Sequence, residues 1–128
     1  MAKKNRIFIS FAIEDEKYRN LLVGHAKNEK SPFEFVDMSV KEPWDEKWKT
    51  NCRTKIKGCD GMIALVSKNT AKASGALWEV ACAKDEKVPL RGVYVDADNK
   101  PAGLPAEFDG VRVVEWTWTN LKNFIDSL

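Results

Sequence analysis

Five short runs of apolar and β-prone residues, separated by stretches of helical character, limit the folds open to this chain more than any other feature. They lie at residues 6–11, 33–37, 61–66, within 87–95 and at 111–115. The first and third runs are nearly continuous in apolar residues, as is typical of strands buried on both faces. Strands that alternate with helices predict right-handed crossovers and a parallel sheet covered on both faces. We therefore expect an α/β, flavodoxin-like fold with five parallel strands in the order 2-1-3-4-5.

Four helices are expected between and after these strands. The first is amphipathic and spans residues 14–30, and the second spans residues 44–57, where Gly58 ends it. The third begins near Ser74 after the strand at 61–66, and the last runs from its cap at Thr117 to residue 125. The second helix carries an apolar stripe at every fourth position, formed by Trp44, Trp48, Cys52 and Ile56.

Composition narrows the class of protein. The chain is expected to form one domain, residues 1–128, that buries about two thirds of its unfolded surface. Its three cysteines have no C-x-x-C spacing, so we expect buried thiols and neither a disulfide framework nor a metal site. No apolar run approaches the roughly eighteen residues that cross a bilayer, which predicts a cytoplasmic protein without membrane contact. A net charge of +2 is too small to indicate a nucleic-acid binder.

One carboxylate, Glu79, stands out in the helix of apolar and small residues that follows the strand at 61–66. On a helical wheel it falls nearly opposite Leu77 and Val80, which are expected to pack on the sheet. Its side chain would lean over Gly75 toward the carboxyl ends of the strands, where parallel α/β sheets bind ligands. Periodicity alone leaves two interpretations: a solvated glutamate away from the core, or the chemical centre of the protein.

The expected switch point lies between the first and third strands. It predicts a crevice lined by residues 10–12, by residues 37–44, and by Ser67 with the helix after it. No G-x-G-x-x-G motif follows the first strand, which disfavours a Rossmann dehydrogenase, and no P-loop is present. Ser67 also stands where a response regulator needs its phosphoacceptor Asp. Three common nucleotide or phosphate chemistries are therefore disfavoured.

Several side chains have two interpretations each. His25, the one histidine, lies on the apolar stripe of the first helix, where a core-edge position is favoured over a catalytic one. Asp37, at the end of the second strand, could bind a ribose hydroxyl or cap its loop. Trp44 and Trp48 are expected in the core, although Trp44 could stack on a base. Trp78 either fills space or lines a pocket or interface.

Five segments, at residues 6–11, 35–39, 59–70, 77–81 and 88–95, occur in an order and spacing that cover nearly the whole chain. Together with the Trp78-Glu79 pair, they resemble the TIR-like domains of the Thoeris anti-phage family. The resemblance implies a TIR fold, which is flavodoxin-like, and an enzyme that cleaves the nicotinamide–ribose bond of NAD. NAD is then the substrate, and no cofactor or metal is implied.

The resemblance also implies the site residues. Glu79 matches the catalytic glutamate of TIR enzymes, and Ser10 and Phe11 match their first-loop serine and aromatic residue. Asp37 and Ser39 match the Asp-x-Ser after the second strand and would hold ribose or phosphate. The ring systems of NAD would be flanked by Phe11 and Trp44. Ser67, which the switch point places in the crevice, is expected to contact the substrate as well. This chain departs from the family pattern in two segments, since residues 11–13 are apolar and residues 75–76 are small.

The implied product is an ADP-ribose-derived signal, expected to be cyclic, that activates a separate effector. The implied partners are further copies of the domain, through TIR contacts, and a phage protein as trigger. The alternative is a non-catalytic TIR-like module for protein interaction or phage sensing.

Overall fold

A parallel sheet of five strands organises the molecule. The computed structural model describes residues 5–28, 33–36 and 44–128. The strands are β1 (Asn5–Ser10), β2 (Phe33–Val36), β3 (Gly61–Val66), β4 (Leu90–Tyr94) and β5 (Val113–Glu115), in the order β2-β1-β3-β4-β5. All four neighbouring pairs are parallel. The predicted fold class and strand order are confirmed.

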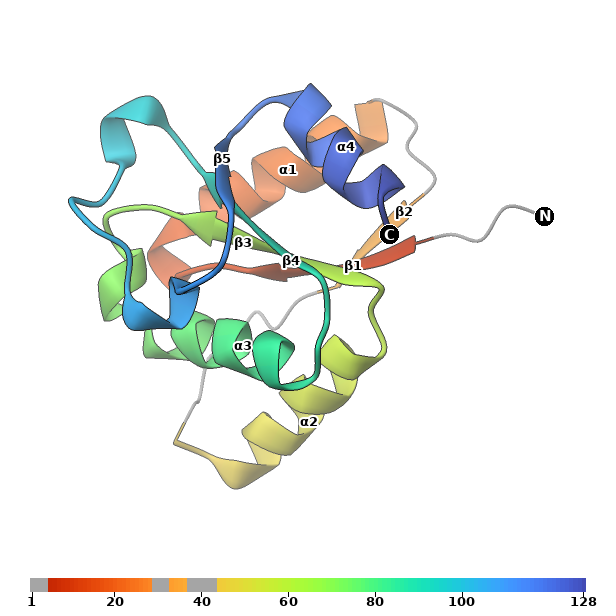
Figure 1. Ribbon diagram of the computed structural model, residues 1–128, viewed down its shortest axis with the longest axis vertical. Coiled ribbons are helices and arrows are strands. Elements are labelled where there is room, and N and C mark those ends of the chain that lie inside the picture. Colours follow the sequence, from red (N-terminus) through yellow and green to blue (C-terminus); the bar gives the residue numbers. More distant parts are fainter. Residues whose placement is uncertain (1–4, 29–32, 37–43) are drawn as a thin grey trace.

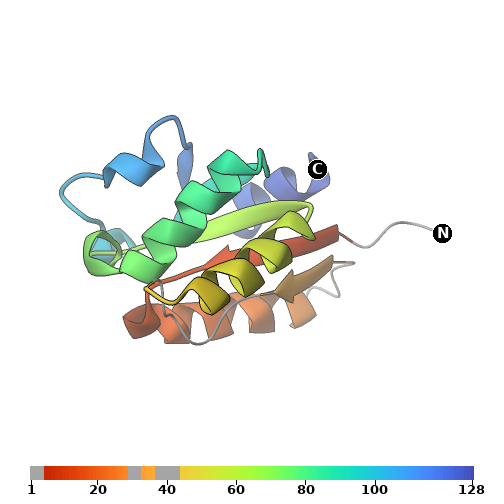
Figure 2. The ribbon, with the colours of Figure 1, turned by 90° about the horizontal axis from the view of Figure 1, so that it is seen from below.

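Four α-helices cover the two faces of this sheet. They are α1 (Glu16–Asn28), α2 (Glu46–Lys57), α3 (Ser74–Asp85) and α4 (Trp118–Asp126). Figures 1 and 2 show α1 and α4 on one face and α2 and α3 on the other. Short 3-10 helices lie in the connections: η1 (Ile13–Asp15), η2 (Thr70–Lys72), η3 (Ala97–Asn99) and η4 (Ala106–Phe108).

The alternating side chains of the central strands supply a separate core to each face. In β1, Phe8 belongs to the core under α2 and α3, whereas Ile7 and Ile9 belong to the core under α1 and α4. In β3, Met62 and Ile63 are divided in the same way. Both strands are fully buried over most of their length, which is why their sequences are apolar at successive positions.

Caps fix the ends of two helices. The Asp45 carboxylate accepts hydrogen bonds from the backbone N–H groups of Lys47 and Trp48, at 2.8 and 3.1 Å, so α2 begins at Glu46. It ends at Gly58, as predicted. The Thr117 hydroxyl accepts from the Asn120 N–H at 3.0 Å, which confirms the predicted cap of α4.

The cap at Asp45 also corrects one prediction. Trp44 was expected in the core on the stripe of the second helix, but it precedes the cap, lies outside α2 and is 76% exposed. The other three members of the stripe are buried, at 6% exposure or less: Trp48, Cys52 and Ile56. A periodic pattern does not show where a helix begins, and the capping carboxylate decides this.

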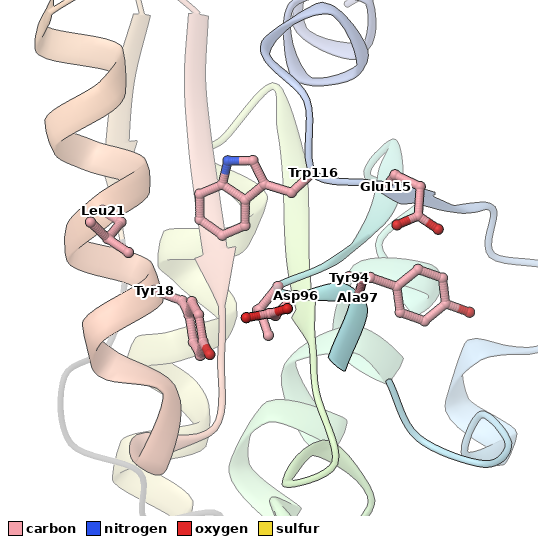
Figure 3. Close-up of a pocket in the computed structure, with 8 residues that line it drawn as sticks. Tyr18, Leu21, Tyr94, Asp96, Ala97, Glu115 and Trp116 are labelled. Carbon is pink, nitrogen blue, oxygen red and sulfur yellow. The ribbon is translucent and has the colours of Figure 1, made fainter. Parts of the chain in front are cut away.

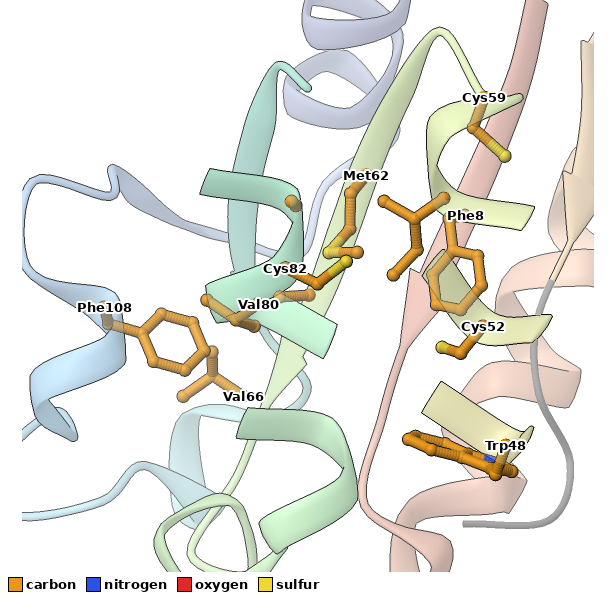
Figure 4. Packing of buried hydrophobic residues seen from close by; sticks show 12 residues of the cluster. Phe8, Trp48, Cys52, Cys59, Met62, Val66, Val80, Cys82 and Phe108 are labelled. Carbon is orange, nitrogen blue, oxygen red and sulfur yellow. The ribbon is translucent and has the colours of Figure 1, made fainter. Parts of the chain in front are cut away.

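The core under α2 and α3 is rich in sulfur. Figure 4 shows Cys52 and Cys59 near Phe8 and shows Cys82 beside Met62. All three cysteines are buried free thiols, which confirms the prediction from their spacing. The hydrophobic cluster of the opposite core contains no sulfur among its described residues, and the Arg91 guanidinium lies over its Phe124 ring at 5.1 Å. The two faces of the sheet therefore differ in chemistry as well as in position.

Candidate active site

Glu79 is fully buried on α3, with a relative exposure of 0%. The wheel placed it away from the core, and this prediction is wrong. Helix α3 contacts β1, β3 and β4 on the sheet and also α2, so it is covered from two directions. Its buried side includes the small residues Gly75, Ala76 and Ala83, whereas Leu77 is only partly buried. A wheel weighted by bulky side chains therefore placed Val80 correctly in the core, at 1% exposure, but missed the small residues that extend the buried side as far as Glu79.

Ser10 is the first partner that the structure gives to this carboxylate. Ser10 is the last residue of β1 and is 1% exposed. Its hydroxyl oxygen lies 3.0 Å from Oε1 of Glu79 and 3.1 Å from the backbone carbonyl oxygen of Ala76. A buried carboxylate needs hydrogen-bond donors in place of the water it has lost, and Ser10 provides one at the carboxyl end of a central strand.

Cys52, on α2, is the second partner. Its thiol donates to Oε2 of Glu79 across 3.7 Å, a distance that the large sulfur atom allows. A second thiol, Cys82, lies one turn further along α3. Burial raises the pKa of Cys82, Arg53 opposes this change, and nearby carboxylates that include Glu79 add to it. Both cysteines were predicted to be buried, but their spacing gave no signal that either would face Glu79.

A small cavity of about 160 Å³ lies at the same edge of the sheet. Phe11 and Trp44 line it together with the first turn of α3, including Gly75 and Ala76. Glu79 is not one of its lining residues. Ser10 connects the cavity to Glu79, because this serine precedes Phe11 in the chain and lies against both Ala76 and Glu79. The predicted pair Phe11 and Trp44 is thus brought together, with Phe11 buried and Trp44 exposed.

Ser67 belongs to a separate buried network between the loops that follow β1 and β3. Its hydroxyl donates to Oδ2 of Asp15 at 2.5 Å, and the Asn69 amide donates to Oδ1 at 3.0 Å. The Thr70 hydroxyl accepts from the Ser67 N–H at 2.8 Å. Asp15 is 1% exposed although its sequence position suggested a helix start. This network ties together the two loops beside the cavity, and sequence analysis missed it.

Two further predicted residues, Asp37 and Ser39, lie outside the described residues. Trp78, for which two interpretations were open, is half-buried and contacts Trp48 edge to face, with ring centroids 5.4 Å apart. Arg53 lies over its ring at 5.7 Å. The guanidinium also pairs with Glu86 at 2.9 Å, and this hydrogen bond raises the pKa of Arg53.

His25 is half-buried at the edge of the opposite core. Its ring centroid lies 4.7 Å from that of Trp118 on α4. It therefore occupies the core-edge position that the sequence favoured, on the face of the sheet that does not carry Glu79. The described residues contain no group of three histidine, cysteine or acidic side chains that could hold a metal ion.

Comparison with known families gives the chain its identity. The model of the family described as "Thoeris protein ThsB, TIR-like domain" matches residues 8–100, which is most of the chain. The chain belongs to this family. The matched part of the TIR-like domain includes Ser10, Cys52 and Glu79, and the resemblance seen in the sequence is confirmed. A search of curated proteins found no match.

Solved structures support the fold of the TIR-like domain. The TIR domain of the Toll-related receptor TRR-2 from Hydra magnipapillata aligns with a TM-score of 0.60 and 15% identity, over 94% of this chain and 91% of that one. A prokaryotic SEFIR domain aligns at 0.58 and 14% identity, over 97% and 89%. The RPS4 and RRS1 TIR domain heterodimer aligns at 0.55 and 12% identity, over 98% and 92%. At these identities the similarity shows the fold alone.

Within the described residues, no helix has both the length and the apolar character needed to span a membrane.

Proposed function

We propose that this TIR-like domain cleaves NAD at the nicotinamide–ribose bond, with Glu79 as the carboxylate that serves the reaction. The observation that carries the proposal is the buried Glu79 carboxylate, held by the Ser10 hydroxyl at the carboxyl end of β1. Natural proteins seldom bury a carboxylate fully without pairing or using it. This one lies at the sheet edge where doubly wound folds bind nucleotides.

The chemistry requires a fixed negative charge near the ribose. When the C–N bond to nicotinamide breaks, its electron pair leaves with the nitrogen, and positive charge develops on the ribose ring. A carboxylate held in place stabilises this oxocarbenium-like transition state and can bind the ribose hydroxyls. Water then captures the ribose carbon to give ADP-ribose, or an atom of the ADP-ribose itself captures it to give a cyclic product. NAD is consumed as a substrate and no cofactor takes part.

The cavity beside Ser10 supplies surfaces for the rest of the nucleotide. Trp44 has an exposed ring at its rim, where it stacks on a ring system of the substrate, and Phe11 forms part of the wall. Asp37 and Ser39 are proposed to hold ribose or phosphate, and Ser67 to support the crevice through its loop. Because Glu79 is fully buried, turnover also requires a rearrangement that brings the ribose to its carboxylate. A trigger during infection, such as a phage protein or assembly of several copies, provides this step.

The test is nicotinamide release from NAD by purified protein, with and without extract of phage-infected cells. Wild type should release nicotinamide in the presence of extract, and Glu79→Gln should be slower by about a hundred-fold or more. Glu16→Gln is a matched control, since Glu16 is exposed at the start of α1. Equal turnover by Glu79→Gln and wild type would remove the catalytic assignment. A product lighter than ADP-ribose by one water would identify cyclisation and a diffusible signal for an effector.

A non-catalytic TIR-like module for protein contacts or phage sensing is the second candidate. The full burial of Glu79 favours it, because a core glutamate with two hydrogen-bond partners can be purely structural. This candidate predicts that wild type leaves NAD intact with every infected-cell extract, while the protein still binds a second TIR copy or a phage protein.

A further inference from the structure

A second concavity lies on the face of the sheet opposite Glu79, between α1 and the carboxyl ends of β4 and β5. Its volume is about 480 Å³. Figure 3 shows the Tyr18 ring, the Trp116 indole and the Asp96 carboxylate together beside it, whereas the side chains of Tyr94 and Glu115, which also border it, turn the other way, and Tyr94 packs against the core under α2 and α3. Leu21, which is 61% exposed, adds an apolar surface on the α1 side. A volume between roughly 300 and 1,000 Å³ is typical of sites for small molecules.

Two lysines of the chain show that the tyrosine rings near this concavity attract positive charge. The Lys17 ammonium lies 5.0 Å from the centroid of the Tyr18 ring, and the Lys100 ammonium lies 4.9 Å from that of Tyr94. Lys100 also forms an ion pair with Glu115. Cations favour the electron-rich faces of aromatic rings within about 6 Å. The Tyr18 ring beside the concavity and the Tyr94 ring on the other face of the sheet are therefore both already paired with a cation.

Trp116 is the third ring, and its indole is the strongest aromatic partner for a cation. Among the described residues, no lysine or arginine lies over it. The tilted Tyr18 ring is its neighbour, with centroids 6.5 Å apart. Figure 3 shows the Asp96 carboxylate below the indole, between Tyr18 and Tyr94. Asp96 caps η3 through Oδ1, which accepts from the Asp98 N–H at 3.0 Å, so the carboxylate is held in place.

We infer that this concavity binds a small organic cation, with an alkylated ammonium group over the Trp116 indole and beside Asp96. The ring faces and Leu21 complement a cation that carries hydrocarbon. A divalent metal ion would instead need several converging oxygen ligands, and no such group exists among the described residues. Because the site is open to solvent, binding is weak, with a dissociation constant of about 1 mM.

The experiment uses choline as the probe and 3,3-dimethylbutan-1-ol, its neutral isostere, as the matched control. Each is titrated at constant ionic strength while the indole N–H signal of Trp116 is followed by NMR. Choline should shift this signal saturably, and the alcohol should bind about three- to five-fold more weakly because it lacks the charge. Equal affinities, or no saturable shift with choline, would overturn the assignment.

Two variants test the residues without disturbing the core. Asp96→Asn keeps a cap of nearly equal strength and removes the charge, so choline should bind about three-fold more weakly. Asp98→Asn makes the same change in net charge at an exposed side chain that does not line the concavity, and should leave affinity unchanged. A loss with Asp98→Asn equal to that with Asp96→Asn would contradict a specific site.

Discussion

The two faces of the sheet have different chemistry under helices of similar length. Beneath α1 and α4 the described hydrophobic cluster is hydrocarbon and aromatic, with Leu121, Phe124 and Ile125 facing the strands and the partly buried Arg91 guanidinium over the Phe124 ring. Beneath α2 and α3 the core holds buried thiols and the Glu79 carboxylate. Burial of a carboxylate opposes folding unless its hydrogen bonds replace those of water. The comparison indicates that the core under α1 and α4 mainly stabilises the fold. The core under α2 and α3 stabilises it less, because it buries a carboxylate at the strand ends.

The largest expected difference between the faces is in stability. Leu121→Ala should lower the free energy of unfolding by about 2–5 kcal/mol, because it leaves a cavity in a core where Leu121 is 1% exposed. Glu79→Gln should change it by less than about 1 kcal/mol, since the amide has nearly the same size and keeps an acceptor for the Ser10 hydroxyl. Urea denaturation followed by tryptophan fluorescence measures both. If Glu79→Gln destabilises as strongly as Leu121→Ala, the carboxylate is structural and the comparison fails.

The thiols under α2 and α3 should make the free energy of unfolding depend on pH in the alkaline range, and the opposite core has no thiol among its described residues that would do so. Burial raises the pKa of Cys59 from 9.0 to about 11. Above pH 9 the unfolded thiol loses its proton while the folded thiol keeps it, so the unfolded state binds fewer protons. Stability therefore falls as pH rises from 9 through 11, by about 2 kcal/mol. The measurement is the difference between wild type and Cys59→Ala across this range, and parallel profiles would contradict it.

Removal of the Ser10 hydroxyl should have a smaller effect, confined to the face of the sheet that carries Glu79. Ser10→Ala deprives Glu79 of a buried donor and should lower the free energy of unfolding by about 1 kcal/mol or more. It should also slow NAD cleavage about ten-fold, because the carboxylate loses a group that orients it. Ser127→Ala, at an exposed residue after α4 whose hydroxyl donates to the backbone carbonyl of Phe124, is the matched control; it should lower the free energy of unfolding by less than Ser10→Ala does and leave NAD cleavage unchanged. Similar losses in both variants would show that Ser10 has no special relation to Glu79.

The smallest effect is expected at Cys52. Cys52→Ser retains a donor toward Oε2 of Glu79 and should alter NAD cleavage by no more than about two-fold. Cys52→Ala removes the donor without adding bulk to this buried site, and should slow cleavage several-fold. Thermal unfolding of both variants controls for packing. Equal rates in the two variants would assign Cys52 to the core alone.

The sequence was sufficient for the fold because strands buried on both faces leave a strong signal. The runs that contain β1 and β3 are apolar at successive positions, and the alternation with helices allows few topologies. Boundaries were less accurate: α2 begins after Trp44 because Asp45 caps it, and β5 is shorter than expected. A local sequence pattern does not show whether a capping residue or a hydrophobic stripe decides where a helix begins.

The site was only partly visible in the sequence. Glu79 and Ser10 were both named, and the structure joins them by a hydrogen bond. Their catalytic and substrate-binding roles stay predictions. The burial of Glu79 was missed because the wheel gave small residues no weight, and the contact with Cys52 spans 27 positions in the chain. The Asp15 and Ser67 network joins two loops 52 positions apart, which periodicity cannot detect.

The hydroxyl of Ser10 has one hydrogen and two acceptors within reach, the carboxylate of Glu79 and the carbonyl of Ala76. When the carboxylate is ionised, that hydrogen is drawn toward it. When the carboxylate takes up a proton, the acid can donate to the serine oxygen, and the serine hydrogen turns to the carbonyl. The Ser10 hydroxyl, the Glu79 carboxylate and the Ala76 carbonyl therefore allow two hydrogen-bond arrangements, which differ in the direction of the serine hydrogen. The position of one hydroxyl hydrogen therefore decides whether Ser10 donates toward the core or toward Ala76, in the first turn of α3 and in the cavity wall.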